Sequence, residues 1–343
     1  MEKSFSRREF LKRSVFLGLG IAGGALIPSV SEALKFDRNL YKVSRTQLLI
    51  GTVVQITAVD PSRDKADHAI GLAFEEIKRL EGILTRFATT SSVGLLNREG
   101  RLKDIPPELR VMVEESVRFH SLTHGAFDIT VKPLLDLYEK RFKEGRQPSE
   151  EEITKAVDLV GTEYLKLTPQ GISFAKEGMG ITLDGIAKGY IVDMASDVMA
   201  KHGIQNFLIN AGGDIRVKGE RKEGGPWKIA IQDPEKKGHY PDVIRLREGA
   251  IATSGNYEVY YDNEMLFHHI VDPATGRSPL DLISVSVVAR STREADALST
   301  ALFVMGPKVG ESFVASYGCD CLLVTRSGEL IGSKGWKALR REV

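Results

Sequence analysis

The sequence predicts a mixed α/β or α+β fold. Runs rich in β-branched residues alternate along the chain with apolar residues at helical spacing, as in mixed folds. The 343 residues are enough for two lobes or one elaborate domain, at roughly 150 residues per domain. A composition of 42% hydrophobic and 27% charged residues excludes a disordered, collagenous or multi-span membrane protein. Lys and Arg (47) balance Asp and Glu (46), so no basic bias indicates nucleic-acid binding.

Residues 1–33 predict a twin-arginine export signal. Ser6-Arg7-Arg8-Glu9-Phe10-Leu11-Lys12 carries the paired arginines, a Gly-rich apolar run covers 14–27, and Ser31-Glu32-Ala33 offers a cleavage site. A membrane anchor is the alternative, but this run is shorter than the roughly 20 residues of a spanning helix. We therefore expect a periplasmic protein, delivered already folded by the twin-arginine export machinery.

The first predicted elements are a strand and two helices. Leu48–Val59 (LLIGTVVQITAV) is rich in β-branched residues and predicts a strand. Apolar residues three and four apart predict a helix over Asp64–Ile83. Pro106-Pro107 begins a second helix that runs to Thr123, and Gly125 is its stop signal.

A capping box opens the next helix. Ser149 with Glu152 three residues later precedes Ile153–Val160, and Gly161 ends the segment. The remaining predicted elements are helices over about 185–202 and 293–305, and strands over 207–211, 227–232, 243–246, 283–289 and 321–325. Cys319 and Cys321 lie two apart at a strand start, where bridging requires awkward geometry, so free, buried thiols are expected.

Two glycine-rich turns suit phosphate. Gly212-Gly213 follows the predicted strand 207–211, where exposed N–H groups approach a ligand closely; a turn without a ligand is the alternative. Gly185 begins a predicted helix that carries Lys188, and free N–H groups at a helix start favour an anion. An ordinary capped helix with a surface lysine is the alternative there.

Asp296 and Thr300 predict a shared helix face, because residues four apart point the same way. One carboxylate and one hydroxyl, completed by waters and substrate phosphate, suit Mg²⁺. The same spacing is also common on helices without a metal.

Two further segments hold candidate side chains. His268 and His269 point to opposite faces if the segment is extended. Either one facing a site would serve as a general base near neutral pH; one buried and one at the surface is the alternative. In Ala126-Phe127-Asp128 an aromatic beside an acid suits a heterocycle, and a hydrophobic staple with an N-cap is the alternative. Periodicity predicts only a polar loop over residues 85–97.

The order and spacing of these segments resemble one family, the FAD:protein FMN transferases, also called the ApbE or flavin-transferase family. The resemblance runs from about Gly51 to Gly328. The export signal and the ITLDGIAKGYIVD segment look most like the NosX-type branch. The segments that carry the resemblance are GT at 51, TRFATTSSVGLLN at 85, THGAFDITVKPLLDLY at 123, ITLDGIAKGYIVD at 181, NAGGDIRVKG at 210, ATSGNYEVYY at 252, HHIVDPATGRSP at 268 and ADALSTALFVMG at 295.

The resemblance implies a two-lobed α+β architecture, ApbE-like and T-fold-related, with an FAD cleft between the lobes. Residues 34–343 would form a single catalytic domain after the signal at 1–33. The implied metal ligands are Gly185, through its backbone carbonyl, Asp296 and Thr300; His269 matches the histidine near the reaction centre. The implied FAD contacts are Ile50, Phe87, Ala126, Phe127, Asp128, Thr182, Lys188 and Ile270.

Two of these positions depart from the family pattern. The family commonly has Asp where this chain has Thr182, and often Met where it has Ile50. A polar contact made by the family's Asp would then move to Asp184 or weaken.

The resemblance also implies a reaction. A threonine or serine hydroxyl of an acceptor attacks the FMN-side phosphorus of FAD, AMP leaves, and FMN stays attached through a phosphoester. The implied cofactor is Mg²⁺, with FAD as substrate. The implied partner is an exported or membrane-anchored flavoprotein, such as part of a respiratory complex. A Mg²⁺-dependent FAD pyrophosphatase and a non-catalytic periplasmic flavin-binding protein are the alternatives.

Overall fold

The computed structural model describes residues 31–37, 40–221, 224–234 and 240–340. The predicted export signal therefore lies outside the described residues except for its last three, which begin strand β1 (Ser31–Asp37). Within the described residues, no helix combines the length and the hydrophobicity needed to cross a membrane.

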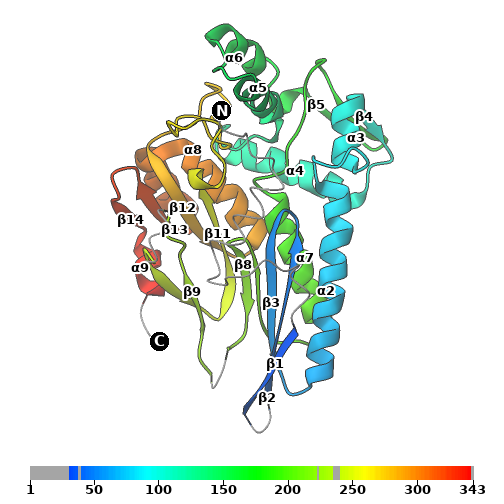
Figure 1. Ribbon diagram of the computed structural model, residues 1–343, viewed down its shortest axis with the longest axis vertical. Helices are drawn as coiled ribbons and strands as arrows, with labels where there is room; N and C mark the ends of the chain where they lie inside the picture. Colours follow the sequence, from blue (N-terminus) through cyan, green and yellow to red (C-terminus); the bar gives the residue numbers. More distant parts are fainter. Residues whose placement is uncertain (1–30, 38–39, 222–223, 235–239, 341–343) are drawn as a thin grey trace.

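The centre of the molecule is an antiparallel sheet, and Figure 1 shows α5 (Lys132–Lys143) and α6 (Glu150–Val157) lying above its upper end. Among the described residues it has nine strands in the order β1-β2-β3-β7-β8-β11-β12-β13-β14. Two small sheets, β10-β9 and β4-β6-β5, lie beside it. The remaining strand bounds are β2 (Leu40–Leu49), β3 (Thr52–Asp60), β4 (Arg101–Lys103), β5 (Leu165–Thr168), β6 (Gly171–Phe174), β7 (Asn206–Ala211), β8 (Asp214–Lys218), β9 (Trp227–Ala230), β10 (Val243–Leu246), β11 (Glu248–Gly255), β12 (Leu282–Ala289), β13 (Asp320–Thr325) and β14 (Leu330–Gly332).

Helices α2, α7 and α8 pack against strands of the main sheet. The mixed fold predicted from the sequence is confirmed. The helix bounds are α2 (Arg63–Leu84), α3 (Ser92–Glu99), α4 (Pro107–Leu122), α5 (Lys132–Lys143), α6 (Glu150–Val157), α7 (Ala187–Lys201), α8 (Thr292–Tyr317) and α9 (Lys334–Leu339), with short 3-10 turns η1 (Ile129–Val131), η2 (Thr162–Tyr164) and η3 (Asn256–Glu258).

Both faces of the main sheet are buried against other elements. Since successive side chains along a strand point to opposite faces, neighbouring residues belong to different cores. Ile209 of β7 and Leu323 of β13 belong to the large core that includes α2, α7 and α8. Their neighbours Leu208 and Leu322 belong to a second core with Trp227 of β9 and the buried indole of α9. A third cluster joins α5, α6 and the segment after the paired histidines. The helical region of α5 and α6 lies at one end of the main sheet, and the candidate site described below lies between the two.

The predicted strand Leu48–Val59 is wrong in one respect, because a hairpin turn interrupts it. Leu49 pairs with Thr52, and the two residues between them, Ile50 and Gly51, have φ of 47° and 72°. Two consecutive positive φ values define the tight turn that suits twisted antiparallel strands. Glycine adopts this conformation freely, but a β-branched isoleucine is strained there. Such strain is found mainly at functional sites.

Other predicted elements differ in extent. Residues 85–97 are not simply a polar loop, because Ser91 caps α3 and its hydroxyl accepts the N–H of Gly94. The helix predicted to end at 305 continues to Tyr317 after a kink at Gly306, whose φ is 72°, followed by Pro307. The capping box of α6 is confirmed. Both cysteines are free, as predicted; Cys321 is buried and Cys319 half-buried.

Candidate functional site

A pocket of about 640 Å³ opens at one end of the main sheet. This volume lies within the ~300–1,000 Å³ typical of small-molecule sites. The hairpin turn β2–β3, the glycine turn β7–β8, strands β9 and β11, and the starts of α7 and α8 line it. Of the twelve residues that the sequence singled out, the pocket brings together Ile50, Phe127, Asp128, Thr182, Gly185, Lys188, His269, Ile270, Asp296 and Thr300.

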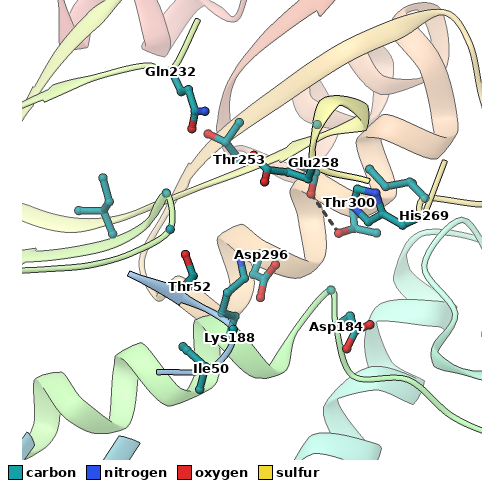
Figure 2. A pocket seen from close by; sticks show the side chains of 18 of the residues that line it. Ile50, Thr52, Asp184, Lys188, Gln232, Thr253, Glu258, His269, Asp296 and Thr300 are labelled. Atoms are coloured by element: carbon teal, nitrogen blue, oxygen red, sulfur yellow. Dashed lines mark hydrogen bonds between the residues drawn. The ribbon is translucent and has the colours of Figure 1, made fainter. Parts of the chain in front are cut away.

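The centre of the pocket is a buried group of opposite charges, shown in Figure 2. Lys188, in the first turn of α7, lies beside Asp296 of α8. Its ammonium forms an ion pair with the buried carboxylate of Asp214, with Nζ and Oδ2 2.9 Å apart. Asp214 begins β8 directly after Gly212-Gly213, so the glycine turn holds the partner of the lysine.

Burial decides the electrostatics of this group. Burial and the neighbouring charge of Asp214 raise the pKa of Asp296 well above its usual range. Burial would lower the pKa of Lys188, but the carboxylates of Asp214 and Asp296 outweigh it and raise that pKa. The lysine therefore stays charged. With one ammonium beside two buried carboxylates, the ionised form of Asp296 is disfavoured, and a further cation would stabilise it.

Oxygen donors gather around Asp296. A Cβ built on Gly185 would lie 3.0 Å from Thr300 Oγ1, so the backbone of Gly185 closely approaches that hydroxyl. Thr300 Oγ1 lies 3.1 Å from Ser254 Oγ, and Asp296 Oδ2 accepts the N–H of Gly189 at 3.0 Å. A carboxylate, a hydroxyl and nearby backbone form a hard-oxygen donor set that fits Mg²⁺. Within the described ranges, no three His, Cys, Asp or Glu side chains come together in an arrangement that could hold a metal ion by themselves.

The loop before α7 is held in place by the segment 85–97. The side-chain amide of Asn97 accepts the N–H of Ile181 at 2.7 Å and donates to its carbonyl at 2.9 Å. Arg86 Nε donates to Asp184 Oδ2 at 2.8 Å. Arg86 and Asn97, which the hydrophobic periodicity of the sequence did not indicate, thus hold the backbone that leads to Gly185. Only the family resemblance drew attention to this segment.

Thr182 is turned toward the backbone. Its N–H donates to the carbonyl of Ile129 at 2.7 Å, and its hydroxyl accepts the N–H of Asp184 at 3.2 Å. The hydroxyl therefore stabilises the turn before Gly185. Asp184 lies on the exposed wall of the pocket, two residues along the chain from Thr182, and a transfer of the family's polar contact to it stays a prediction.

The two histidines face different ways, as the sequence predicts. His268 is fully buried, its Nε2 lies 2.9 Å from the carbonyl oxygen of Pro279, and it packs edge-on against Phe303. His269 lines the pocket, and its Nδ1 lies 3.4 Å from the carbonyl oxygen of Val259. A proton on Nδ1 leaves Nε2 as the basic nitrogen. Burial lowers the pKa of His269, so the ring is neutral near pH 7.

Asp128 of the predicted flavin segment is tightly bonded. Its Oδ1 accepts both the N–H and the hydroxyl of Thr130, at 2.7 and 2.5 Å. Its Oδ2 lies 3.1 Å from Nδ1 of His120 on α4, and this contact raises the pKa of the histidine. Phe127, next to it, is buried and reaches the pocket wall. Asp128 is therefore an N-cap, as one interpretation expected, and the segment also lines the pocket; its contact with a heterocycle stays a prediction.

Two predicted flavin contacts lie outside the pocket wall. Phe87 is 50% exposed, with the guanidinium of Arg86 over its ring at 4.2 Å. Ala126 is half-buried and packs against the large core. The roles of both residues stay predictions. The pocket wall also includes Thr52, from the Gly51-Thr52 segment that the resemblance marked, and three residues that the sequence did not single out individually, namely Gln232, Thr253 and Glu258.

The buried His268 predicts an acid-sensitive fold. Burial lowers its pKa from 6.5 to about 4. Between these values the unfolded chain binds a proton that the folded protein does not, so stability falls as the pH falls from 6.5 to about 4. Denaturant unfolding across this range should show a flatter pH dependence for His268→Gln. His68→Gln, at an exposed histidine of α2, is the matched control, and equal pH dependence in both variants would contradict the assignment.

Fold and pocket together define a mixed α/β protein whose half-buried lysine, glycine turns and oxygen donors suit a phosphate-bearing ligand. The chain belongs to the ApbE family, whose model matches residues 50–323. A Vibrio cholerae protein named FAD:protein FMN transferase is 34% identical over 224 residues, which are 64% of this chain and 67% of the relative. A Haemophilus influenzae protein of the same name is 32% identical and covers 67% of this chain and 70% of its own length.

Two solved structures share the fold. The ApbE protein of Thermotoga maritima superposes with a TM-score of 0.80 at 32% identity, covering 88% of this chain and all of its own. The flavin transferase ApbE of Vibrio cholerae has a TM-score of 0.75 at 26% identity and covers 91% of this chain and all of its own. The family and the fold expected from the sequence are therefore both confirmed.

Proposed function

We propose that this chain, as an FAD:protein FMN transferase, binds FAD and Mg²⁺ in the pocket around Asp296. The FMN moiety then passes to a threonine or serine hydroxyl of an acceptor flavoprotein, and AMP leaves. The observation that carries the proposal is the buried Asp296 beside Lys188, Thr300 and the backbone of Gly185. This grouping joins a cation site to a fixed positive charge.

The metal site would be formed by Asp296, Thr300 and the carbonyl of Gly185. When bound, Mg²⁺ would supply a Lewis acid that neutralises charge on the pyrophosphate. Lys188, fixed by Asp214 at 2.9 Å, adds an ammonium suited to a phosphate oxygen. Because these groups are held before substrate arrives, they lose little free energy to reorganisation in the transition state.

His269 is the residue best placed to take the proton of the acceptor hydroxyl. It lines the pocket, its ring is neutral near pH 7, and the contact of Nδ1 with Val259 leaves Nε2 free to accept. Hydroxyl attack on phosphorus breaks the bond to the AMP oxygen, and the attacking oxygen remains in the new phosphoester. Lys188 stabilises the charge that the departing AMP phosphate carries away.

An acceptor assay tests the proposal. The chain without residues 1–33 is incubated with FAD, Mg²⁺ and a candidate acceptor, and bound flavin is detected by fluorescence on a denaturing gel. We expect a fluorescent acceptor band that EDTA abolishes and that an acceptor lacking the hydroxyl does not form. AMP release without a fluorescent band for any acceptor would instead indicate a pyrophosphatase.

The acceptor is expected on the far side of the inner membrane. The twin-arginine pattern Ser6–Lys12 supports export of this chain, and such signals serve proteins that fold before transport. An exported or membrane-anchored flavoprotein, such as part of a respiratory complex, is the corresponding partner. Replacement of Arg7 and Arg8 by lysine should retain the protein in the cytoplasm, and cell fractionation would detect this.

A further inference from the structure

Helices α7 and α8 begin side by side, and each brings one charged residue to the pocket. Lys188 lies in the first turn of α7 and Asp296 near the start of α8. Their close approach requires a glycine, because a Cβ on Gly189 would lie 2.4 Å from the carbonyl oxygen of Thr292. The contact between the two helix starts therefore sets the positions of the lysine and the carboxylate.

One hydrogen bond links this contact directly to the carboxylate. The N–H of Gly189 belongs to the first turn of α7, where amides lack partners within the helix. It donates to Asp296 Oδ2 at 3.0 Å. The orientation of Asp296 thus depends on where α8 lies relative to α7.

Asp193, one turn further along α7, fastens the two helices together. Its Oδ1 accepts the N–H of Thr292 at 2.8 Å, and its Oδ2 accepts the N–H of Arg293 at 2.9 Å. The hydroxyl of Ser291 accepts the N–H of Glu294 at the same helix end. Helix α8 therefore has both its own cap and one from α7. A carboxylate at a helix N-terminus is also favoured by the helix dipole.

We propose that Asp193 is a positioning residue for the metal site. It does not line the pocket; it ties the start of α8 to α7 and thereby sets Asp296 against Lys188 and the backbone of Gly185. The inference rests on the proposed function, since it concerns how strongly the site holds Mg²⁺. In Asp193→Asn, an NH₂ group replaces one carboxylate oxygen and faces a backbone N–H of α8. The variant therefore loses one of the two hydrogen bonds between α7 and α8 without leaving a cavity.

The test measures metal affinity apart from turnover. Quenching of flavin fluorescence by the protein is titrated with Mg²⁺ for the wild type, Asp193→Asn and Asp193→Ala. The concentration of Mg²⁺ at half effect should rise about 10–100-fold in both variants, as expected when a residue supporting a metal ligand is lost. FAD binding without metal should change less than about twofold. Asp197→Asn, one turn further on α7 at an exposed position, should behave as the wild type.

The outcomes separate this inference from the proposed function. Unchanged Mg²⁺ dependence in both Asp193 variants, with only a lower melting temperature, would overturn the positioning role. A wild type whose FAD binding and transfer ignored Mg²⁺ would contradict the proposed function and this inference with it. Asp193→Asn is nearly isosteric and Ser291 still caps α8, so this variant is expected to fold; circular dichroism at the titration temperature checks it.

Discussion

Asp296→Asn should reduce FMN transfer by about 10²–10³-fold, the size of effect seen when a group that stabilises transition-state charge is lost. The amide keeps the shape of the side chain and can still accept the N–H of Gly189. It removes the charged ligand of the proposed metal site. Steady-state transfer at limiting and at saturating Mg²⁺ provides the measurement. If Asp296→Asn were as active as the wild type at limiting Mg²⁺, the assignment of Asp296 as a metal ligand would be contradicted.

The fold should survive this substitution. Asp296 is a buried carboxylate beside another buried carboxylate, and Lys188 does not fully offset the cost of its burial, so its charge opposes folding in the absence of a metal ion. The melting temperature without Mg²⁺ should therefore be maintained or raised. Thr300→Val and Thr300→Ser form a matched pair at the second side-chain ligand. The valine should weaken Mg²⁺ binding and raise the Mg²⁺ concentration needed for half-maximal transfer, whereas the serine, which keeps the hydroxyl, should not.

His269→Ala should lower turnover by about 10²–10⁴-fold with little change in FAD affinity, the range for loss of one general base. The base acts when its ring is neutral, so transfer should rise with pH through its pKa. Burial lowers the pKa of His269, so the rate should reach its plateau at a lower pH than for a free histidine, which titrates near ~6.5. In His269→Ala the rise of the transfer rate with pH that His269 causes should be absent.

The neighbouring histidine supplies the contrast. His268 is buried and bonded to Pro279, so His268→Ala should lower stability and leave the chemical step nearly unchanged. Parallel loss of FAD binding and turnover in His269→Ala would instead make His269 a binding contact. Glu258, an exposed carboxylate on the pocket wall, would then be the better candidate base. Asp272 is less suitable, because its oxygens accept bonds within its own turn.

Sequence patterns predicted the elements whose burial is periodic. Helix α2 has its buried residues three and four apart, and the observed helix differs from the prediction by one residue at each end. The hairpin at Ile50-Gly51 was missed because an isoleucine with positive φ carries no turn signal. Strand β8 was missed because only two of its five residues, Ile215 and Val217, are apolar, whereas the four-residue β10, which was predicted, has three.

The site residues also differ in whether local sequence patterns could predict them. Asp296 and Thr300 are visible because helical spacing alone places them together. The pairing of Lys188 with Asp214, and of Asn97 with Ile181, joins distant segments through the sheet and the loop before α7. No local period predicts such contacts, since they depend on tertiary packing. The family resemblance marked the segments, and the structure showed how they meet.

We propose that the Asp296 pocket transfers FMN to an acceptor rather than hydrolysing FAD. The direct measurement is the ratio of AMP released to FMN bound covalently to the acceptor, determined in one reaction with Mg²⁺ by chromatography and by mass of the intact acceptor. A transferase predicts a ratio near one, with both products lost together in Asp296→Asn. AMP formed in large excess over acceptor-bound FMN, with free FMN making up the difference, would contradict the account.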